Sequence, residues 1–126
     1  MRYLLDTNIL VYLLCSVHEL SPSAKRVLES ERYLFVSMVS LWEIAIKQSL
    51  GKLAIALSVL EIVSVCRDRR IDILPLEARS IERIKTLPDI HRDPFDRLLV
   101  AQALEGNLAI VTRDRMIPQY PVQTIR

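Results

Sequence analysis

The chain has 126 residues and a mass of 14.5 kDa, which is the size of one domain. Its residues are 51% hydrophobic and 25% charged, so a disordered or low-complexity protein is excluded. Lys and Arg number 17 against 15 Asp and Glu, and the net charge of +2 permits a polyanionic partner without demanding one. We therefore expect a single domain spanning residues 1–126.

The N-terminal region contains no candidate export or membrane segment. The uncharged stretch 7–17 is far shorter than the roughly 20 apolar residues of a membrane-spanning helix, and Asp6 interrupts any signal peptide. We therefore expect a cytoplasmic protein that does not contact a membrane. Cys15 and Cys66 lie in apolar, helix-like segments, which favours free, buried thiols over a disulfide.

The first half of the chain alternates short apolar runs with helical patterns. A strand is predicted at 2–5, followed by a helix at 9–14. Ser21 and Pro22 are typical of the N-cap and first residue of a second helix, which runs to about Arg32 before a strand at 33–36. A longer helix is predicted over 37–52, mostly buried, with an apolar side formed by Val39, Trp42, Ile46 and Leu50.

The second half repeats this alternation. We expect a helix at 57–66, a strand at 71–74, a helix at 77–87 and a loop at 88–93. Asp93 and Pro94 are typical of a helix start, and this helix should reach Gly106 before a strand at 108–112. A last strand at 122–125 is placed at the sheet edge by Pro118 and Pro121. Alternating strands and helices predict a parallel sheet covered by helices.

Four acidic residues are predicted to meet at one edge of this sheet. Asp6 and Asp114 each follow an apolar strand directly, and the carboxyl ends of parallel strands share one edge. Asp96 lies in the first turn of a helix that begins at the same edge. Glu43 is the single acid in the apolar hexapeptide 41–46, so its carboxylate must find a cation.

Taken one at a time, these acids also have structural explanations. Asp6 and Asp114 are equally suited to capping the helices that follow them, and Asp93 is best explained as an N-cap. Glu43 stands four residues before Lys47, which is the spacing of an ordinary helical ion pair.

Together the four acids favour a metal site. Carboxylates at one edge repel one another and raise each other's pKa unless a divalent cation neutralises them. A site made only of oxygen ligands suits Mg²⁺ or Mn²⁺, and such ions support the hydrolysis of phosphodiesters. Thr7, Asn8 and Thr112 stand beside the acids and are candidates to hydrogen-bond a carboxylate, although Thr7 and Asn8 are equally typical of a helix start.

Four arginines are interleaved with the acids: Arg92, Arg97, Arg113 and Arg115. Guanidinium groups match phosphate well, so this pattern is compatible with a nucleic-acid groove, and Arg97 and Arg113 are the candidates to contact a substrate phosphate. Charge balance at the surface explains any single one of them as well.

Several motifs in this order carry a resemblance to a known family. They are Leu4-Leu5-Asp6-Thr7-Asn8, Ser40-Leu41-Trp42-Glu43-Ile44, the block from Asp93-Pro94-Phe95-Asp96-Arg97 to Ala103, and Val111-Thr112-Arg113-Asp114. The chain from about Arg2 to Asp114 resembles a PIN-domain ribonuclease of the VapC toxin type. The resemblance implies a three-layer α/β/α sandwich with a mostly parallel sheet. It also implies an Mg²⁺- or Mn²⁺-dependent endoribonuclease, a small cognate antitoxin protein as partner, and a homodimer.

The same resemblance assigns roles to residues. Asp6, Glu43, Asp96 and Asp114 match the family's four metal-binding, catalytic acids, and Thr112 matches a polar position that accompanies the last of them. Asp93 has no place in this quartet, which agrees with its interpretation as a helix cap.

Other classes of enzyme lack their motifs in this chain. There is no phosphate-binding loop of the Gly-x-x-x-x-Gly-Lys type and no Gly-x-Ser-x-Gly motif, and Cys15 with His18 forms only half of a zinc site. A haloacid-dehalogenase-like phosphatase requires a second Asp at position 8, where this chain has Asn. The alternative that stays open is a catalytically inactive PIN-like module that binds nucleic acid or an antitoxin. Because none of the four acids is missing, the sequence favours activity.

Overall fold

The computed structural model describes residues 1–31 and 33–126, and a parallel sheet lies at its centre. The described strands are β1 (Tyr3–Leu5), β2 (Leu34–Ser37), β3 (Ile71–Leu74), β4 (Ala109–Val111) and β5 (Thr124–Ile125). They lie in the order β3-β2-β1-β4-β5, and every neighbouring pair is parallel. β1 is therefore the central strand, and β5 lies at an edge as predicted.

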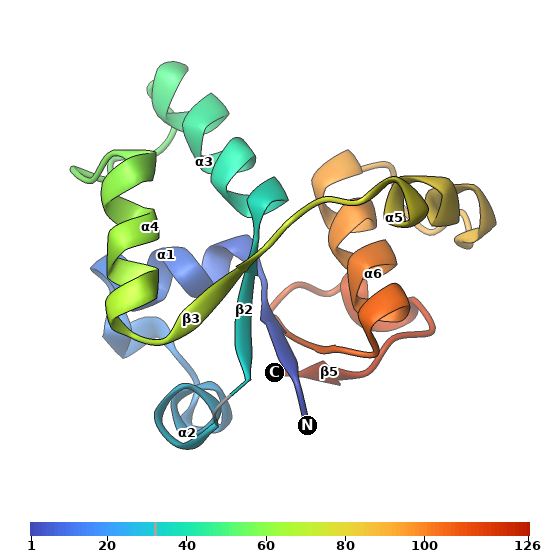
Figure 1. Ribbon diagram of the computed structural model, residues 1–126, viewed down its shortest axis with the longest axis horizontal. Helices are drawn as coiled ribbons and strands as arrows, with labels where there is room; N and C mark the ends of the chain where they lie inside the picture. Colours follow the sequence, from blue (N-terminus) through green and yellow to red (C-terminus); the bar gives the residue numbers. More distant parts are fainter. Residues whose placement is uncertain (32) are drawn as a thin grey trace.

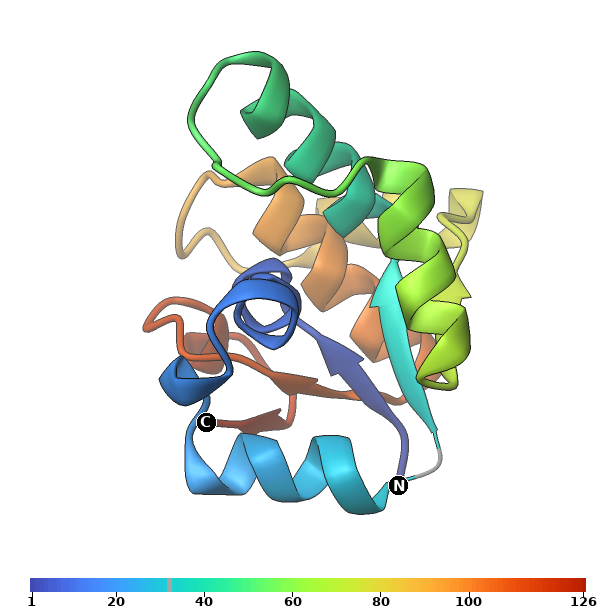
Figure 2. The ribbon, with the colours of Figure 1, turned by 90° about the vertical axis from the view of Figure 1, so that its left-hand side faces the viewer.

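Helices cover both faces of the sheet. They are α1 (Thr7–Cys15), α2 (Pro22–Ser30), α3 (Met38–Ser49), α4 (Val59–Asp68), α5 (Ala78–Arg83) and α6 (Pro94–Gly106), with short 3-10 turns η1 (Val17–Glu19), η2 (Ile84–Thr86) and η3 (Ile117–Gln119). α1, α2 and α4 lie on one side and α5 and α6 on the other (Figure 1). Figure 2 views the molecule from the side of the first group. The predicted three-layer α/β/α fold is confirmed.

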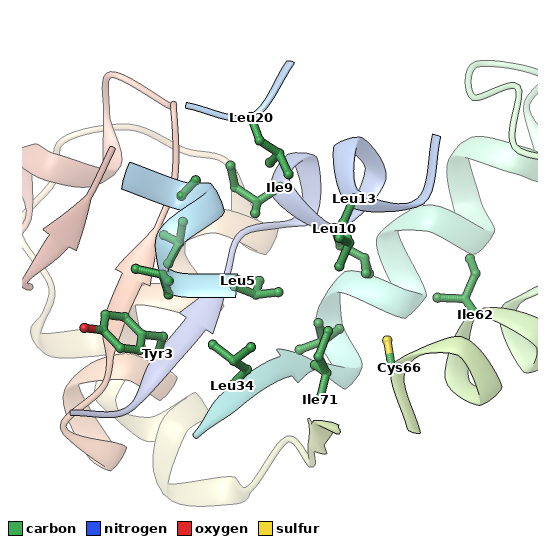
Figure 3. Close-up of a cluster of buried hydrophobic side chains, with 14 of the residues drawn as sticks. Tyr3, Leu5, Ile9, Leu10, Leu13, Leu20, Leu34, Ile62, Cys66 and Ile71 are labelled. Atoms are coloured by element: carbon green, nitrogen blue, oxygen red, sulfur yellow. The ribbon is translucent and has the colours of Figure 1, made fainter. Parts of the chain in front are cut away.

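The side chains of each strand alternate between two separate cores. Leu5 and Val36 point into the core beneath α1, α2 and α4, where they meet Ile9 and Ile62 (Figure 3). Leu4, the neighbour of Leu5 on β1, points into the opposite core, which contains Leu99 of α6 and Ile110 of β4. Leu4, Leu5, Ile9, Ile62, Leu99 and Ile110 are all completely buried. Both cores hold β1 in place, and with it the residue that follows it.

Local sequence signals explain where the best-predicted helices begin and end. The Asp93 carboxylate accepts hydrogen bonds from the backbone N–H groups of Phe95 and Asp96, so Asp93 is the N-cap of α6 as predicted. The helix ends at Asn107, whose φ of 52° is left-handed. At α4, Ser58 and Glu61 form a capping box, which places this helix two residues later than the predicted range of 57–66.

Three predictions about helices need correction. On the side of α3 that was predicted to be apolar, Val39 is buried, but Trp42 is 53% exposed and Leu50, just after the helix, is also exposed, so the helix is not mostly buried. The reason is that α3 packs through Leu41 and Ile44, and Trp42 instead meets the Phe95 ring edge-on, 5.1 Å away between centroids. The helix predicted at 77–87 is divided into α5 and η2, and α2 ends at Ser30, while Arg32 lies outside the described residues.

The two cysteines differ in environment. Both are free thiols, as predicted, but the prediction that both are buried is wrong for Cys15, which is exposed as the last residue of α1. Cys66 is on the buried side of α4, and burial raises the pKa of its thiol. Within the described ranges, no helix combines the length and apolar character that a bilayer span requires.

Candidate functional site

The four predicted acids lie together in a cavity at the carboxyl end of the sheet. In Figure 1, β1 and β2 run upward into α1 and α3. The residues that line the cavity follow β1 and β4 or belong to α1, α3 and the start of α6. Its volume is about 140 Å³, and its walls are formed by Asp6, Thr7, Asn8, Glu43, Lys47, Asp93, Asp96 and Asp114. The order in which the strands are added to the sheet reverses between the neighbouring strands β1 and β4. Ligands of open α/β sheets bind at such a switch point.

Asp6 is the most deeply placed of these acids. It is the N-cap of α1, and its Oδ1 accepts a 2.8 Å hydrogen bond from the N–H of Thr7. Its Oδ2 accepts a 2.7 Å hydrogen bond from the Thr112 hydroxyl. The pKa of Asp6 is raised from 3.8 to about 6, chiefly by burial. The nearby carboxylates Glu43 and Asp114 contribute to this increase, and the two hydrogen bonds oppose it. Asp6 therefore both caps a helix and faces the cavity.

Asp96 is the second acid whose charge is costly in the absence of a cation. It lies in the first turn of α6, and its pKa is raised from 3.8 to about 7, chiefly by burial. The carboxylates of Asp6, Asp93 and Asp114 raise this pKa further, whereas a hydrogen bond from His91 lowers it. Two carboxyl groups of one cavity thus give up their protons at a higher pH than free aspartate does.

Glu43 forms the ion pair that its spacing predicts and also lines the cavity. The Lys47 Nζ lies 2.9 Å from Glu43 Oε2, and this bond raises the pKa of Lys47. The negative potential of Asp93 and Asp96 raises that pKa as well. The structural explanation of Glu43 is therefore correct, and it does not remove Glu43 from the site.

Asp114 connects the end of β4 to the next turn. Its Oδ2 accepts 3.0 Å hydrogen bonds from the backbone N–H groups of Met116 and Ile117, and its own N–H donates to the Thr112 hydroxyl. Asp114 therefore caps this turn, as Asp6 caps α1. Thr112 joins the two acids, because its hydroxyl donates to Asp6 and accepts from the N–H of Asp114.

The remaining polar candidates divide by their contacts. Thr112 bonds to an acid as predicted, but the Thr7 hydroxyl donates to Ser40 Oγ at 2.8 Å instead of to a carboxylate. Only the backbone N–H of Thr7 reaches Asp6. Asn8 is exposed at the mouth of the cavity. Residues 6–8 therefore form the start of α1 and also line the cavity.

The two arginines that were candidates for phosphate contact have different surroundings. The Arg97 guanidinium is turned inward, where Nη1 donates to the carbonyls of Pro88 and His91 and to the Tyr120 hydroxyl, at 3.0, 3.3 and 2.9 Å. Its contacts are those of a residue that holds the 88–91 loop. Arg113 is partly exposed and pairs with Glu19 at 3.2 Å.

A basic hollow of about 500 Å³ adjoins the acidic cavity and shares Asn8 and Asp114 with it. Its other walls are Tyr12, Arg113, Arg115, Met116 and Arg126. Arg113 and Arg115 thus lie beside the acids, as the sequence predicts, whereas Arg92 is exposed and lines neither space.

His91 is the residue of this site that sequence reasoning did not identify. Its Nε2 lies 3.0 Å from Asp96 Oδ2, and one ligand atom each from His91, Asp96 and Asp114 lie within 4.8 Å of one another. The 88–93 stretch has no periodicity, and the other partner of His91 is Tyr120, 29 residues later. The only local signal was a histidine two residues before a helix cap.

The donor set fits a hard divalent cation. Five acidic residues line one small cavity that holds a single lysine, so the cavity carries an excess of negative charge. Carboxylate oxygens are the ligands that Mg²⁺ and Mn²⁺ prefer. The pKa values of Asp6 and Asp96 are raised chiefly by burial and also by neighbouring carboxylates, so a bound cation would stabilise the ionised form of both groups.

The five-stranded parallel sheet with helices on both faces and carboxylates at its switch point places this chain among the α/β/α sandwich domains. Residues 3–123 match the PIN domain family, and this chain belongs to that family. The search of curated proteins returned no match.

Solved structures of similar fold include VapBC2 from Rickettsia felis, crystallised with a DNA fragment from its promoter. It has a TM-score of 0.74 and 19% identity, over 99% of this chain and 98% of that one. A toxin–antitoxin complex from Klebsiella pneumoniae has a TM-score of 0.64 and 19% identity, over 98% and 96% of the two chains. FitAcB from Neisseria gonorrhoeae has a TM-score of 0.66 and 18% identity, also over 98% and 96%. At these identities the similarity establishes the fold.

Proposed function

We propose that this PIN domain is a metal-dependent endoribonuclease and the toxin component of a toxin–antitoxin pair. The observation that carries the proposal is the convergence of Asp6, Glu43, Asp96 and Asp114 on one cavity in which two carboxyl groups have raised pKa values. Mg²⁺ or Mn²⁺ is the proposed cofactor, and RNA the proposed substrate.

The proposed partners follow from the structural neighbours. One is described as a toxin–antitoxin complex and others as VapBC assemblies. By analogy, a small antitoxin protein binds this chain and holds it inactive, and the active form is a cytoplasmic homodimer.

Each residue of the site has a distinct part in the proposed reaction. Asp6, Glu43, Asp96 and Asp114 would hold the cation, which when bound supplies activation of a water molecule and neutralisation of phosphate charge. Thr112 holds Asp6 next to Asp114, because its hydroxyl donates to the Asp6 carboxylate and accepts from the Asp114 N–H. Lys47 keeps the Glu43 carboxylate in place at the cavity wall. Asp93 starts α6 and thereby orients Asp96.

The first test is the chemistry of the cleaved ends. Attack by water breaks the P–O3′ bond and leaves a 5′-phosphate and a 3′-hydroxyl. A pool of single-stranded and structured RNA should be cut in the presence of Mg²⁺ or Mn²⁺, and EDTA should stop the cleavage. Products should accept ligation at the 5′ end without prior phosphorylation.

Two other outcomes contradict the proposal. Ends that carry a 2′,3′-cyclic phosphate indicate attack by the ribose 2′-hydroxyl, as by a contaminating ribonuclease. Metal binding without cleavage of any RNA in the pool would favour the catalytically inactive binding module.

The basic hollow beside the cavity is the proposed path of the RNA strand. Arg113→Ala should flatten the plot of log binding constant against log salt concentration by about 0.7, the expected change for one lost phosphate contact on a single strand. Glu19→Gln is the matched variant, because it removes the acid paired with Arg113 and keeps the arginine. It should bind RNA more tightly with an undiminished slope.

Both affinities can be measured in an Asp6→Asn background, which does not consume the RNA. If Arg113→Ala leaves the slope unchanged, Arg113 only balances Glu19 at the surface.

A further inference from the structure

His91 lies within the acidic site but on a loop, between η2 and α6. Its imidazole Nε2 is 3.0 Å from Asp96 Oδ2, and its side chain is only 14% exposed. The chain has one other histidine, His18, whose side chain is 81% exposed beside Glu19. Of the two histidines, only His91 is largely buried and bonded to an acid of the site.

A chain of hydrogen bonds holds His91 from its other side. The Tyr120 hydroxyl is 2.8 Å from His91 Nδ1, and Arg97 Nη1 is 2.9 Å from the same hydroxyl. Tyr120 is buried after η3, while Arg97 is on α6 one residue beyond Asp96. Three separate segments of the chain thus converge on one imidazole ring.

The donors in this network determine which ring nitrogen carries hydrogen. A guanidinium only donates, so the Tyr120 oxygen accepts a hydrogen bond from Arg97. The Tyr120 hydroxyl then donates its own hydrogen bond to another acceptor. The nearest acceptor is Nδ1 at 2.8 Å, whereas the His91 carbonyl is 3.4 Å away. Nε2 then carries the hydrogen and donates it to Asp96. The chain of donation runs from Arg97 through Tyr120 and His91 to Asp96.

We propose that His91 is a positioning residue, which fixes the rotation of the Asp96 carboxylate for the divalent cation. This inference rests on the proposed function. His91 occupies Oδ2 of Asp96, so that the other oxygen is left for the cation, and the Arg97–Tyr120 pair keeps the imidazole from turning away. Such a hydrogen bond to a ligand typically contributes a factor of about 10 to 100 in metal affinity.

Direct ligation by His91 is less consistent with these contacts. To ligate a cation, Nε2 would have to give up both its hydrogen and its bond to Asp96. The oxygen-rich cavity suits Mg²⁺ or Mn²⁺, which take carboxylate ligands in preference to imidazole.

The test is Mn²⁺ affinity, which is separate from activity. The single tryptophan, Trp42, adjoins Glu43 and packs against Phe95, the neighbour of Asp96, so quenching of its fluorescence reports Mn²⁺ binding. His91→Ala should weaken binding by about 10- to 100-fold. His91→Gln, whose amide retains an N–H donor, should recover most of the loss.

Two further variants separate positioning from folding. Tyr120→Phe keeps the buried ring and removes the hydroxyl, so it should weaken Mn²⁺ binding by a smaller factor in the same direction. His18→Ala is the matched control and should bind Mn²⁺ as the wild type does. Circular dichroism of each variant establishes that the fold is retained.

The outcomes that overturn the proposal are distinct. Wild-type affinity in both His91→Ala and Tyr120→Phe would mean that His91 only anchors its loop. Nitrogen coupling to Mn²⁺ in the electron spin-echo spectrum of the wild type, absent in His91→Gln, would make His91 a ligand. Failure of the wild type itself to bind Mn²⁺ would remove the metal site and the proposed function together.

Discussion

Replacing Asp6 with Asn is expected to abolish metal-dependent RNA cleavage and, in metal-free protein at pH 7, to make the fold more stable. The loss of rate should be at least about a hundredfold, because the buried carboxylate is central to the cation site. Asn has nearly the same shape, and its oxygen can still accept from the N–H of Thr7.

The gain in stability has a separate origin. The pKa of Asp6 rises from 3.8 to about 6 on folding, so keeping this group ionised costs about 3 kcal/mol near pH 7. Asn does not carry this cost. Thermal unfolding in EDTA should therefore give a higher midpoint for Asp6→Asn than for the wild type.

The combination of lost activity and gained stability is characteristic of a functional acid. Asp89→Asn provides a control, because Asp89 is exposed and lies outside the cavity. Asp89→Asn should change neither the rate of RNA cleavage nor the midpoint of thermal unfolding. Cleavage by Asp6→Asn at the wild-type rate would show that Asp6 takes no part in the reaction. A loss of stability at pH 7 would show that the contribution of Asp6 as a helix cap outweighs the cost of burying its charge.

The stability of the metal-free protein should fall as pH rises from about 4 to about 7. Between the unfolded value of 3.8 and the folded values of about 6 for Asp6 and about 7 for Asp96, the folded state holds protons that the unfolded state has released. Deprotonation therefore favours unfolding throughout that window. Above it, both states have lost these protons and the slope disappears.

Saturating Mg²⁺ or Mn²⁺ should reverse this trend at its upper end, because the cation replaces the protons. Urea denaturation at several pH values, in EDTA and in metal, measures both curves. In EDTA, Asp6→Asn should make the free energy of unfolding depend less on pH, and the dependence that is left should come from Asp96. A stability in EDTA that rises steadily from pH 4 to 7 would contradict the raised pKa values of both acids.

Local signals in the sequence predicted some elements very well. Pro94 and Gly106 bound α6 as expected, because capping and helix termination depend on residues next to one another in the chain. Periodicity could not determine which side of α3 is covered. Trp42 lies in the apolar arc, yet its exposure depends on what packs against α3, and the sequence does not state this.

The acids of the site were predictable because a topological rule brings them together. Residues that follow parallel strands share one edge, so Asp6 and Asp114 could be placed together without knowledge of any contact. His91 could not be placed in this way. Its role depends on a hydrogen bond to Tyr120, and no rule of strand order or helical spacing relates a loop residue to that ring.

The strand order also sets when the acidic cavity can form during synthesis of the chain. β1 is made first, but it pairs on one side with β4, and Asp6 is joined to Thr112 across 106 residues of chain. While the ribosome still holds the segment 109–114, the central strand lacks a neighbour and the cavity lacks one wall. A chain that still lacks this segment therefore cannot complete the cavity, so the proposed cleavage has to wait until β4 has folded against β1.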